Sequence, residues 1–307
     1  MTARVAPRVS QPRLSPIAIA AAKPGFARPK KALLPLWPCT THVCTMEAVL
    51  PSTTASPAGR VTLVGAGPGA PDLLTVRAVK ALAGATVVVH DGLIDPAVLD
   101  LAPGAIRIDV SKRRARHTLA QAAIGDLLIA YARAGHIVVR LKGGDPFIFG
   151  RGGEEVEALD AAGIAVEVVP GVSAALGAAA GALMPLTHRD HASSVSFVAG
   201  TCQNLGDQDW TGLAGKGRTL VVYMGVTNAA AIADKLIADG LAPDMPCAVL
   251  ERGTLPGSRV LRTLLADLGR TVADNAVVSP ALLVIGDVAT LGASVRTRVR
   301  SLLQDIA

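Results

Sequence analysis

From residue 61 onward, the sequence alternates short runs rich in valine with longer stretches of helical periodicity. The runs predict strands at 61–65, 86–90, 106–110, 137–141 and 165–169, with helices at 72–83, 95–101, 118–134 and 153–162 between them. Thr118 is the expected N-cap of the helix at 118–134, and Gly135 lies just past its end. Regular strand–helix alternation is typical of a mainly parallel sheet with helices on both faces.

A second series of elements follows a small-residue helical stretch at 172–183. Its expected strands are 195–199, 219–224, 247–251, 259–263 and 281–286, and its expected helices are 227–239, 263–270 and 290–304. Hairpin-like spacing around LPGS (255–258) predicts that this second sheet is mixed. We therefore expect an α/β fold with two α/β domains, at 59–172 and 173–307.

The basic charge of the chain is concentrated at its N-terminus. Residues 1–46 hold seven Lys or Arg and no Asp or Glu, which leaves 23 basic and 24 acidic residues in the rest. The body is thus nearly neutral and gives no indication of nucleic-acid binding, and it lacks the run of about 20 apolar residues needed to span a membrane. The composition of 1–58 favours a disordered extension or a start misassigned upstream of Met46. A cytoplasmic location is expected, or an organellar one if this segment is a transit peptide.

The four cysteines do not form a metal-binding pattern. Cys39, Cys44, Cys202 and Cys247 are scattered, and His42 between the first two does not complete a usual zinc spacing. We therefore expect unpaired thiols and no metal site.

The first glycine loop, VTLVGAGPGAPD (61–72), raises the possibility of a dinucleotide site. Gly65, Gly67 and Ala70 fit the pattern G-x-G-x-x-G/A, and Asp91 ends the next strand about where a ribose-binding acid would lie. Pro68, however, removes a backbone N–H at the point where such a loop binds phosphate. The loop is better suited to forming a wall of a site than a phosphate nest.

The second glycine loop, LKGGDPFIFGRGGEE (141–155), is the stronger indication of a ligand site. It follows a strand, so it lies at the carboxyl edge of the sheet, where open α/β sheets bind ligands. Gly143 and Gly144 allow close backbone approach, and Asp145 supplies an acceptor. The loop has no P-loop Lys-Ser/Thr, so ATP chemistry is poorly supported.

Six segments together resemble the tetrapyrrole methylase family. GAGPGAPDLLT, VVVHDGLID, RLKGGDPFIFGRGGEE, VPGVSAALGAAAGALMPLTHRD, YMGV and SPALLVIGDV occur in this order over about 61–290. The resemblance implies S-adenosylmethionine as the cofactor, bound in the cleft between two α/β domains, and a homodimer. GGDPFIFGRGGEE is similar to the form found in members that methylate two ring carbons of uroporphyrinogen III. That reaction gives precorrin-2 and S-adenosylhomocysteine, and it serves sirohaem and/or cobalamin biosynthesis.

The resemblance also implies roles for individual residues. Asp91 corresponds to the base that removes a proton from the substrate, and Lys112 to the proton donor. The implied cofactor contacts are Pro68, Gly143, Gly144, Asp145, Ile148, Ser173, Ala174, Met224 and Gly253. The candidates for binding the substrate carboxylates are Arg113, Arg114, Arg116, Arg151, His188 and Arg189. On the residues alone, Met224 is better interpreted as a core residue, and a basic run such as SKRRARH is usually a solvated loop. His188 fits a structural hydrogen-bonding role as readily as substrate binding.

The chain departs from the family pattern beside both catalytic candidates. Gly92 follows Asp91 where a larger residue is common, and Ser111 precedes Lys112 where glycine is usual. Ser173 replaces a frequent threonine and keeps the hydroxyl. We expect the change at Gly92 to affect the rate through the positioning of Asp91.

Three rival hypotheses remain. A family member acting on a later precursor such as precorrin-4 is disfavoured by the loop after GDP. A dehydrogenase or a bifunctional sirohaem synthase would need well over a hundred residues upstream, where the sequence has about 60. A non-catalytic binding module ranks last. Asp91→Asn separates the classes, because loss of a ribose-binding acid weakens cofactor affinity, whereas loss of a base reduces turnover.

Overall fold

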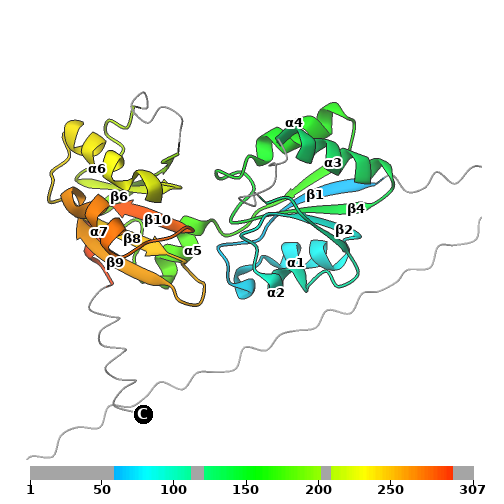
Figure 1. The fold of residues 1–307 in the computed structure, drawn as a ribbon, viewed down its shortest axis with the longest axis horizontal. Coiled ribbons are helices and arrows are strands. Elements are labelled where there is room, and N and C mark those ends of the chain that lie inside the picture. The colour runs from blue at the N-terminus through cyan, green and yellow to red at the C-terminus, as the bar shows by residue number, and fades with distance from the viewer. Residues whose placement is uncertain (1–58, 112–120, 202–208, 293–307) are drawn as a thin grey trace, which may run out of the picture. The chain divides into compact units, whose positions relative to one another are not determined.

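The computed structural model describes residues 59–111, 121–201 and 209–292, which belong to one compact unit. The first sheet has five strands in the order β3-β2-β4-β1-β5, and every neighbouring pair is parallel (Figure 1). Its strands are β1 (Arg60–Gly65), β2 (Val87–His90), β3 (Ile106–Asp109), β4 (Ile137–Lys142) and β5 (Val166–Val169).

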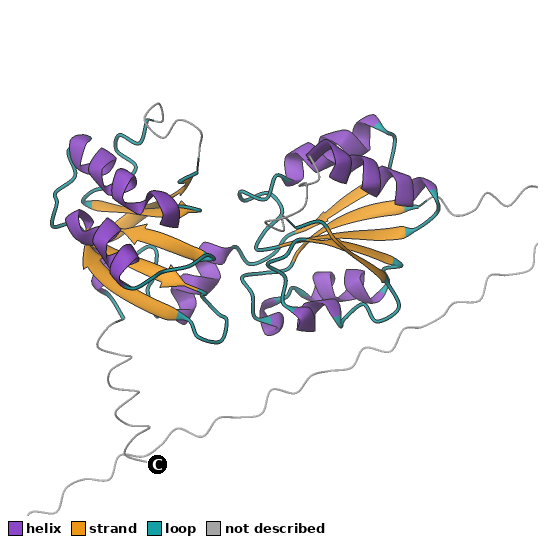
Figure 2. Cartoon of the chain, viewed as in Figure 1, coloured by secondary structure: helices purple, strands orange, loops and turns teal. Residues whose placement is uncertain are grey.

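Helices cover both faces of this sheet (Figure 2). They are η1 (Pro71–Leu73), α1 (Val76–Ala83), α2 (Pro96–Leu99), α3 (Gln121–Arg133) and α4 (Gly152–Ala161). Because side chains alternate along a strand, Val87 and Val89 pack with α3 and α4, whereas Val88 packs with α1 and α2. Asp95 caps α2 by accepting a hydrogen bond from the Ala97 N–H at 2.9 Å.

The second sheet is mixed, in the order β6-β7-β10-β8-β9. Its strands are β6 (Ala192–Ala199), β7 (Gly217–Tyr223), β8 (Pro246–Glu251), β9 (Arg259–Leu264) and β10 (Ala281–Ile285). The β6–β7 pair is parallel and the other pairs are antiparallel. One face packs against α5 (Ala174–Gly181) and η5 (Asp287–Thr290), and the other against α6 (Ala229–Ala238) and α7 (Leu268–Asp274). The short helices η3 (Val226–Asn228) and η4 (Leu265–Asp267) precede α6 and α7.

The expected α/β class and the mixed second sheet are confirmed. The helix expected at 263–270 is wrong, since residues 263–264 complete β9 and α7 begins only at Leu268. Thr118 and most of the segment 290–304 lie outside the described residues. None of the helices in the described ranges has the length and hydrophobicity that a membrane-spanning segment requires.

Candidate functional site

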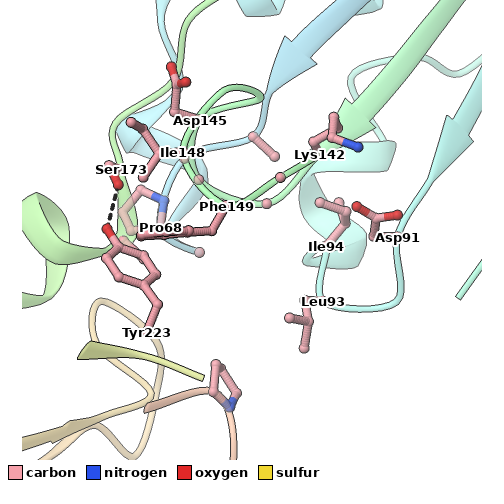
Figure 3. A pocket seen from close by; sticks show the side chains of 18 of the residues that line it. Pro68, Asp91, Leu93, Ile94, Lys142, Asp145, Ile148, Phe149, Ser173 and Tyr223 are labelled. Carbon is pink, nitrogen blue, oxygen red and sulfur yellow. Dashed lines mark hydrogen bonds between the residues drawn. The ribbon is translucent and has the colours of Figure 1, made fainter. Parts of the chain in front are cut away.

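A cavity of about 900 Å³ lies at the carboxyl ends of the first sheet and is bounded on another side by residues of the second, among them Tyr223 (Figure 3). Its volume is within the range of small-molecule sites. All nine predicted cofactor contacts line it: Pro68, Gly143, Gly144, Asp145, Ile148, Ser173, Ala174, Met224 and Gly253. Asp91 and Arg151 line it as well. The structure thus brings together residues that are far apart in the sequence.

The two glycine loops are hydrogen-bonded to each other. Gly144 N donates to Gly67 O at 2.7 Å, and Gly67 N donates to Gly144 O at 3.2 Å. Pro68 lies against α5, where a Cβ on Gly177 would be 2.3 Å from Pro68 Cγ. The backbone of the first loop therefore pairs with that of the second loop through hydrogen bonds, and Pro68 of the first loop forms a packed part of the cavity wall.

Asp145 shapes the second loop. Its Oδ1 accepts from Phe147 N at 2.9 Å, and its Oδ2 accepts from Gly171 N at 3.0 Å. The carboxylate thereby ties the loop to the turn that precedes Ser173. A Cβ on Gly143 would meet no heavy atom within 4 Å, so the backbone there is open to a ligand.

Tyr223, which the sequence analysis did not identify, caps α5 from the end of β7. Ser173 is the N-cap residue, but its Oγ lies 2.6 Å from Tyr223 Oη and makes no capping bond (Figure 3). Ala175 N donates to the tyrosine oxygen at 3.0 Å instead. The Phe149 ring packs on Tyr223 at a centroid distance of 4.8 Å. The sequence signal that could have identified Tyr223 was its position next to Met224 in the YMG motif.

Met224 and Gly253 contribute to the cavity wall from the loops that follow β7 and β8 of the second sheet. Met224 has a φ of 55° and is 46% exposed, so its interpretation as core filler is wrong. The nearby Thr201 Oγ1 lies 3.7 Å from the Met224 sulfur. A Cβ on Gly253 would lie 2.4 Å from Ala178 Cβ, so glycine is required for this loop to touch α5.

A buried cluster of charges stands beside Asp91. Arg140 Nη2 donates to Asp91 Oδ1 at 2.7 Å, and Glu155 Oε1 accepts from Arg140 Nε at 3.1 Å and from Lys142 Nζ at 2.9 Å. The side chains of both cations are 3% exposed and that of Glu155 is 0% exposed. Burial, together with the nearby Arg140 guanidinium, lowers the pKa of Lys142 from its ordinary value, and the attraction of Glu155 offsets this only in part. The sequence signal that could have indicated this cluster was the presence of two cationic residues, Arg140 and Lys142, in the otherwise apolar strand HIVVRLK.

Of the described candidates for binding substrate carboxylates, only Arg151 lines the cavity. Arg151 lines the cavity and pairs with Glu154 through two hydrogen bonds, of 2.9 and 2.7 Å. His188 and Arg189 are not among the lining residues, and His188 Nδ1 accepts from Asp190 N at 3.1 Å. Lys112, Arg113, Arg114 and Arg116 lie outside the described residues. Among the residues that are described, no group of three His, Cys, Asp or Glu could hold a metal ion.

Two of the three departures from the family pattern, Gly92 and Ser111, are in contact. A Cβ on Gly92 would lie 2.6 Å from Ser111 Cβ, closer than two such atoms can approach. The small residue at 92 therefore leaves the space that the Ser111 side chain occupies. Both residues line the cavity next to Asp91.

Comparisons with known proteins agree on one family. A sequence model of the tetrapyrrole (corrin/porphyrin) methylases matches residues 60–269. A siroheme synthase of Gluconacetobacter diazotrophicus is 52% identical over 237 residues, or 76% of this chain and 50% of that protein. One of Pseudomonas fluorescens (strain SBW25) is 50% identical over 76% of this chain and 51% of its own length. The chain thus spans about half the length of these curated relatives.

Comparison with solved structures indicates the same family, and the matches cover nearly the whole length of the solved chains. Uroporphyrin-III C-methyl transferase from Thermus thermophilus, complexed with S-adenosylhomocysteine, is 42% identical with a TM-score of 0.66, covering 76% of this chain and 94% of that one. A cobalt precorrin-4 methyltransferase is 28% identical with a TM-score of 0.67, covering 75% and 95%.

Proposed function

This chain belongs to the tetrapyrrole methylase family, and from that premise we propose that it methylates uroporphyrinogen III at two ring carbons to give precorrin-2, with S-adenosylmethionine as cofactor. One observation carries the proposal, namely that all nine positions assigned to the cofactor line a single cavity together with Asp91. The identity of 42% to a structure named uroporphyrin-III C-methyl transferase, against 28% to the precorrin-4 enzyme, supports this substrate over a later precursor.

The residues of the cavity fit S-adenosylmethionine. Gly143 leaves its backbone open, and Ile148 and Met224 present apolar surface that is 38% and 46% exposed and that a bound nucleoside and thioether would cover. When bound, this cofactor supplies an electrophilic methyl group and leaves as S-adenosylhomocysteine. Pro68 and the loop of Asp145 form the wall that orients it.

Asp91 serves as the proton acceptor in this proposal. Methylation of a pyrrole carbon leaves a proton to be removed, and the Asp91 carboxylate is 37% exposed at the cavity. Lys112 corresponds to the proton donor of the family, and Arg113, Arg114 and Arg116 would hold substrate carboxylates through bidentate contacts. The roles of these four residues rest on the family resemblance.

Two further proposals concern assembly. We propose that 59–172 and 173–307 are separate α/β domains, each built on one of the two sheets. We also propose a homodimer, which the family resemblance supports and light scattering of the purified chain would test.

The test is the release of S-adenosylhomocysteine from S-adenosylmethionine during anaerobic incubation with uroporphyrinogen III. The wild-type chain is expected to release two equivalents for each uroporphyrinogen III consumed. Asp91→Asn is expected to lose turnover and to keep its affinity for S-adenosylhomocysteine. Binding of S-adenosylhomocysteine without any release from uroporphyrinogen III would reject this substrate and favour a later precursor.

A further inference from the structure

We propose that Arg140 is a positioning residue for Asp91, and that Glu155 in turn holds Arg140 in place. The inference rests on the proposed role of Asp91 as proton acceptor. It assigns a purpose to a guanidinium that is only 3% exposed and lines the cavity beside Asp91.

The strand register places Arg140 beside Asp91. In the parallel pair β2–β4, Val89 stands opposite Arg140. Asp91 lies two residues beyond Val89, so its side chain is directed to the same face of the sheet as that of Arg140. The resulting contact from Arg140 Nη2 to Asp91 Oδ1 is 2.7 Å long.

The guanidinium has little freedom to move. Its Nε donates to Glu155 Oε1 at 3.1 Å, and its Nη1 donates to the carbonyls of Leu141 at 3.2 Å and Val89 at 3.5 Å. Because the guanidinium is planar, fixing Nε and Nη1 also fixes the direction of Nη2. Arg140 therefore offers Asp91 a donor in a fixed position.

Glu155 is anchored through one oxygen, Oε1, whereas its buried Oε2 has no hydrogen-bond partner among the described residues. Its Oε1 also accepts from Lys142 Nζ at 2.9 Å and from Gln121 Nε2 at 3.0 Å. The four charged groups of the cluster, two cations and two carboxylates, balance one another. Since a buried ion left without a partner is costly, each member holds the others in place.

Asp91 is the only partly exposed member of these four. A surface carboxylate at the end of a strand normally samples several rotamers, and a solvated ion pair would restrain it weakly. Here the cation is 3% exposed and already fixed, so the pair restricts Asp91 to one orientation. A proton acceptor gains from this restriction because misplacement of a catalytic group by about 1 Å can cost on the order of 10²-fold in rate.

A double-mutant cycle separates positioning from a merely structural role. The variants Arg140→Gln, Asp91→Asn and the double variant are made in the full chain, and turnover is followed by S-adenosylhomocysteine release from uroporphyrinogen III. Gln keeps a neutral donor, and Glu155 keeps Lys142 and Gln121 as partners. The matched control is Arg262→Gln, because Arg262 donates to the carbonyls of Ala289 and Leu291 and does not line the cavity.

Arg140→Gln is expected to lower kcat on the order of 10²-fold, with KM for uroporphyrinogen III and the Kd for S-adenosylhomocysteine unchanged. In the Asp91→Asn background it is expected to have no further effect, and Arg262→Gln is expected to leave kcat unchanged. Three results would overturn the inference: an unchanged kcat for Arg140→Gln, the same fold-loss in both backgrounds, or full activity of Asp91→Asn. A wild-type chain that releases nothing from uroporphyrinogen III would instead reject the proposed function.

If circular dichroism shows that Arg140→Gln is unfolded, Arg140→Lys replaces it in the cycle. Lysine keeps the buried positive charge but lacks the planar fork that reaches Glu155 and Asp91 together. The same loss of kcat and the same absence of effect in the Asp91→Asn background are expected, and retention of full activity would overturn the inference.

Discussion

Removing the Tyr223 hydroxyl tests whether this tyrosine caps α5. Tyr223→Phe deletes the contacts of its Oη with Ser173 Oγ at 2.6 Å and with Ala175 N at 3.0 Å. Tyr223 and Ser173 are 8% and 7% exposed, so water does not readily replace the lost partner. The ring, and with it the packing against Phe149, is retained.

The size of the expected destabilisation follows from the two groups that lose their partner, Ser173 Oγ and Ala175 N. An unsatisfied buried donor or acceptor costs about 1–3 kcal/mol, and loss of a helix N-cap about 1 kcal/mol. Tyr223→Phe is therefore expected to lower the free energy of unfolding by roughly 2–4 kcal/mol. Ser173→Ala keeps the bond from Ala175 N to the tyrosine and is expected to cost only about 1 kcal/mol.

Urea unfolding followed by far- and near-UV circular dichroism measures both values, provided that the two transitions coincide. The double variant Tyr223→Phe/Ser173→Ala should be less destabilised than the sum of the single variants, because the Ser173 hydroxyl is no longer left unpaired. A Tyr223→Phe variant within about 0.5 kcal/mol of the wild type, or one no less stable than Ser173→Ala, would refute the capping role.

Other predictions concern single sites. Gly92→Ala is expected to cost about 1–3 kcal/mol of unfolding free energy, because its Cβ would lie 2.6 Å from Ser111 Cβ. Adding Ser111→Gly to the Gly92→Ala variant should recover the lost stability. A urea titration in which the double variant is no more stable than Gly92→Ala would refute the proposed steric clash between the two side chains. Burial raises the pKa of Cys247 to about 12, so its thiol should resist iodoacetamide at pH 8 in the folded chain. Peptide mass spectrometry that finds Cys247 labelled without denaturant would contradict this. The hydrogen bond from Arg259 lowers the pKa of Glu251, so its carboxylate stabilises the fold above the ordinary glutamate range and loses that contribution as the pH falls through its lowered pKa. The stability difference between wild type and Glu251→Gln should therefore shrink below about pH 4, and a difference independent of pH would argue against this coupling.

The strands of the first sheet could be predicted because each is a short β-branched run that ends where turn residues begin. Val87–His90 and Ile137–Lys142 lie within one residue of their expected positions. The run TLL at 263–265 was ambiguous, since its apolar residues suit either the end of a strand or the start of a helix. Pairing of β9 with β8 decided in favour of the strand up to Leu264.

The residues around the cavity were predictable where a loop motif carries them and not where the fold alone brings them together. Gly143 and Asp145 stand in a distinctive loop. Arg140 stands in an apolar strand, and its meeting with Glu155 depends on the rotation of α4 against the sheet. Tyr223 reaches Ser173 across 50 residues of sequence. No local pattern encodes such long-range contacts.

The most direct test of the account is mass spectrometry of the tetrapyrrole formed when the full chain is incubated anaerobically with uroporphyrinogen III and S-adenosylmethionine. The account predicts a product that carries two added methyl groups, with the singly methylated species as a transient intermediate. Recovery of unmethylated substrate from a chain that binds S-adenosylhomocysteine would contradict it.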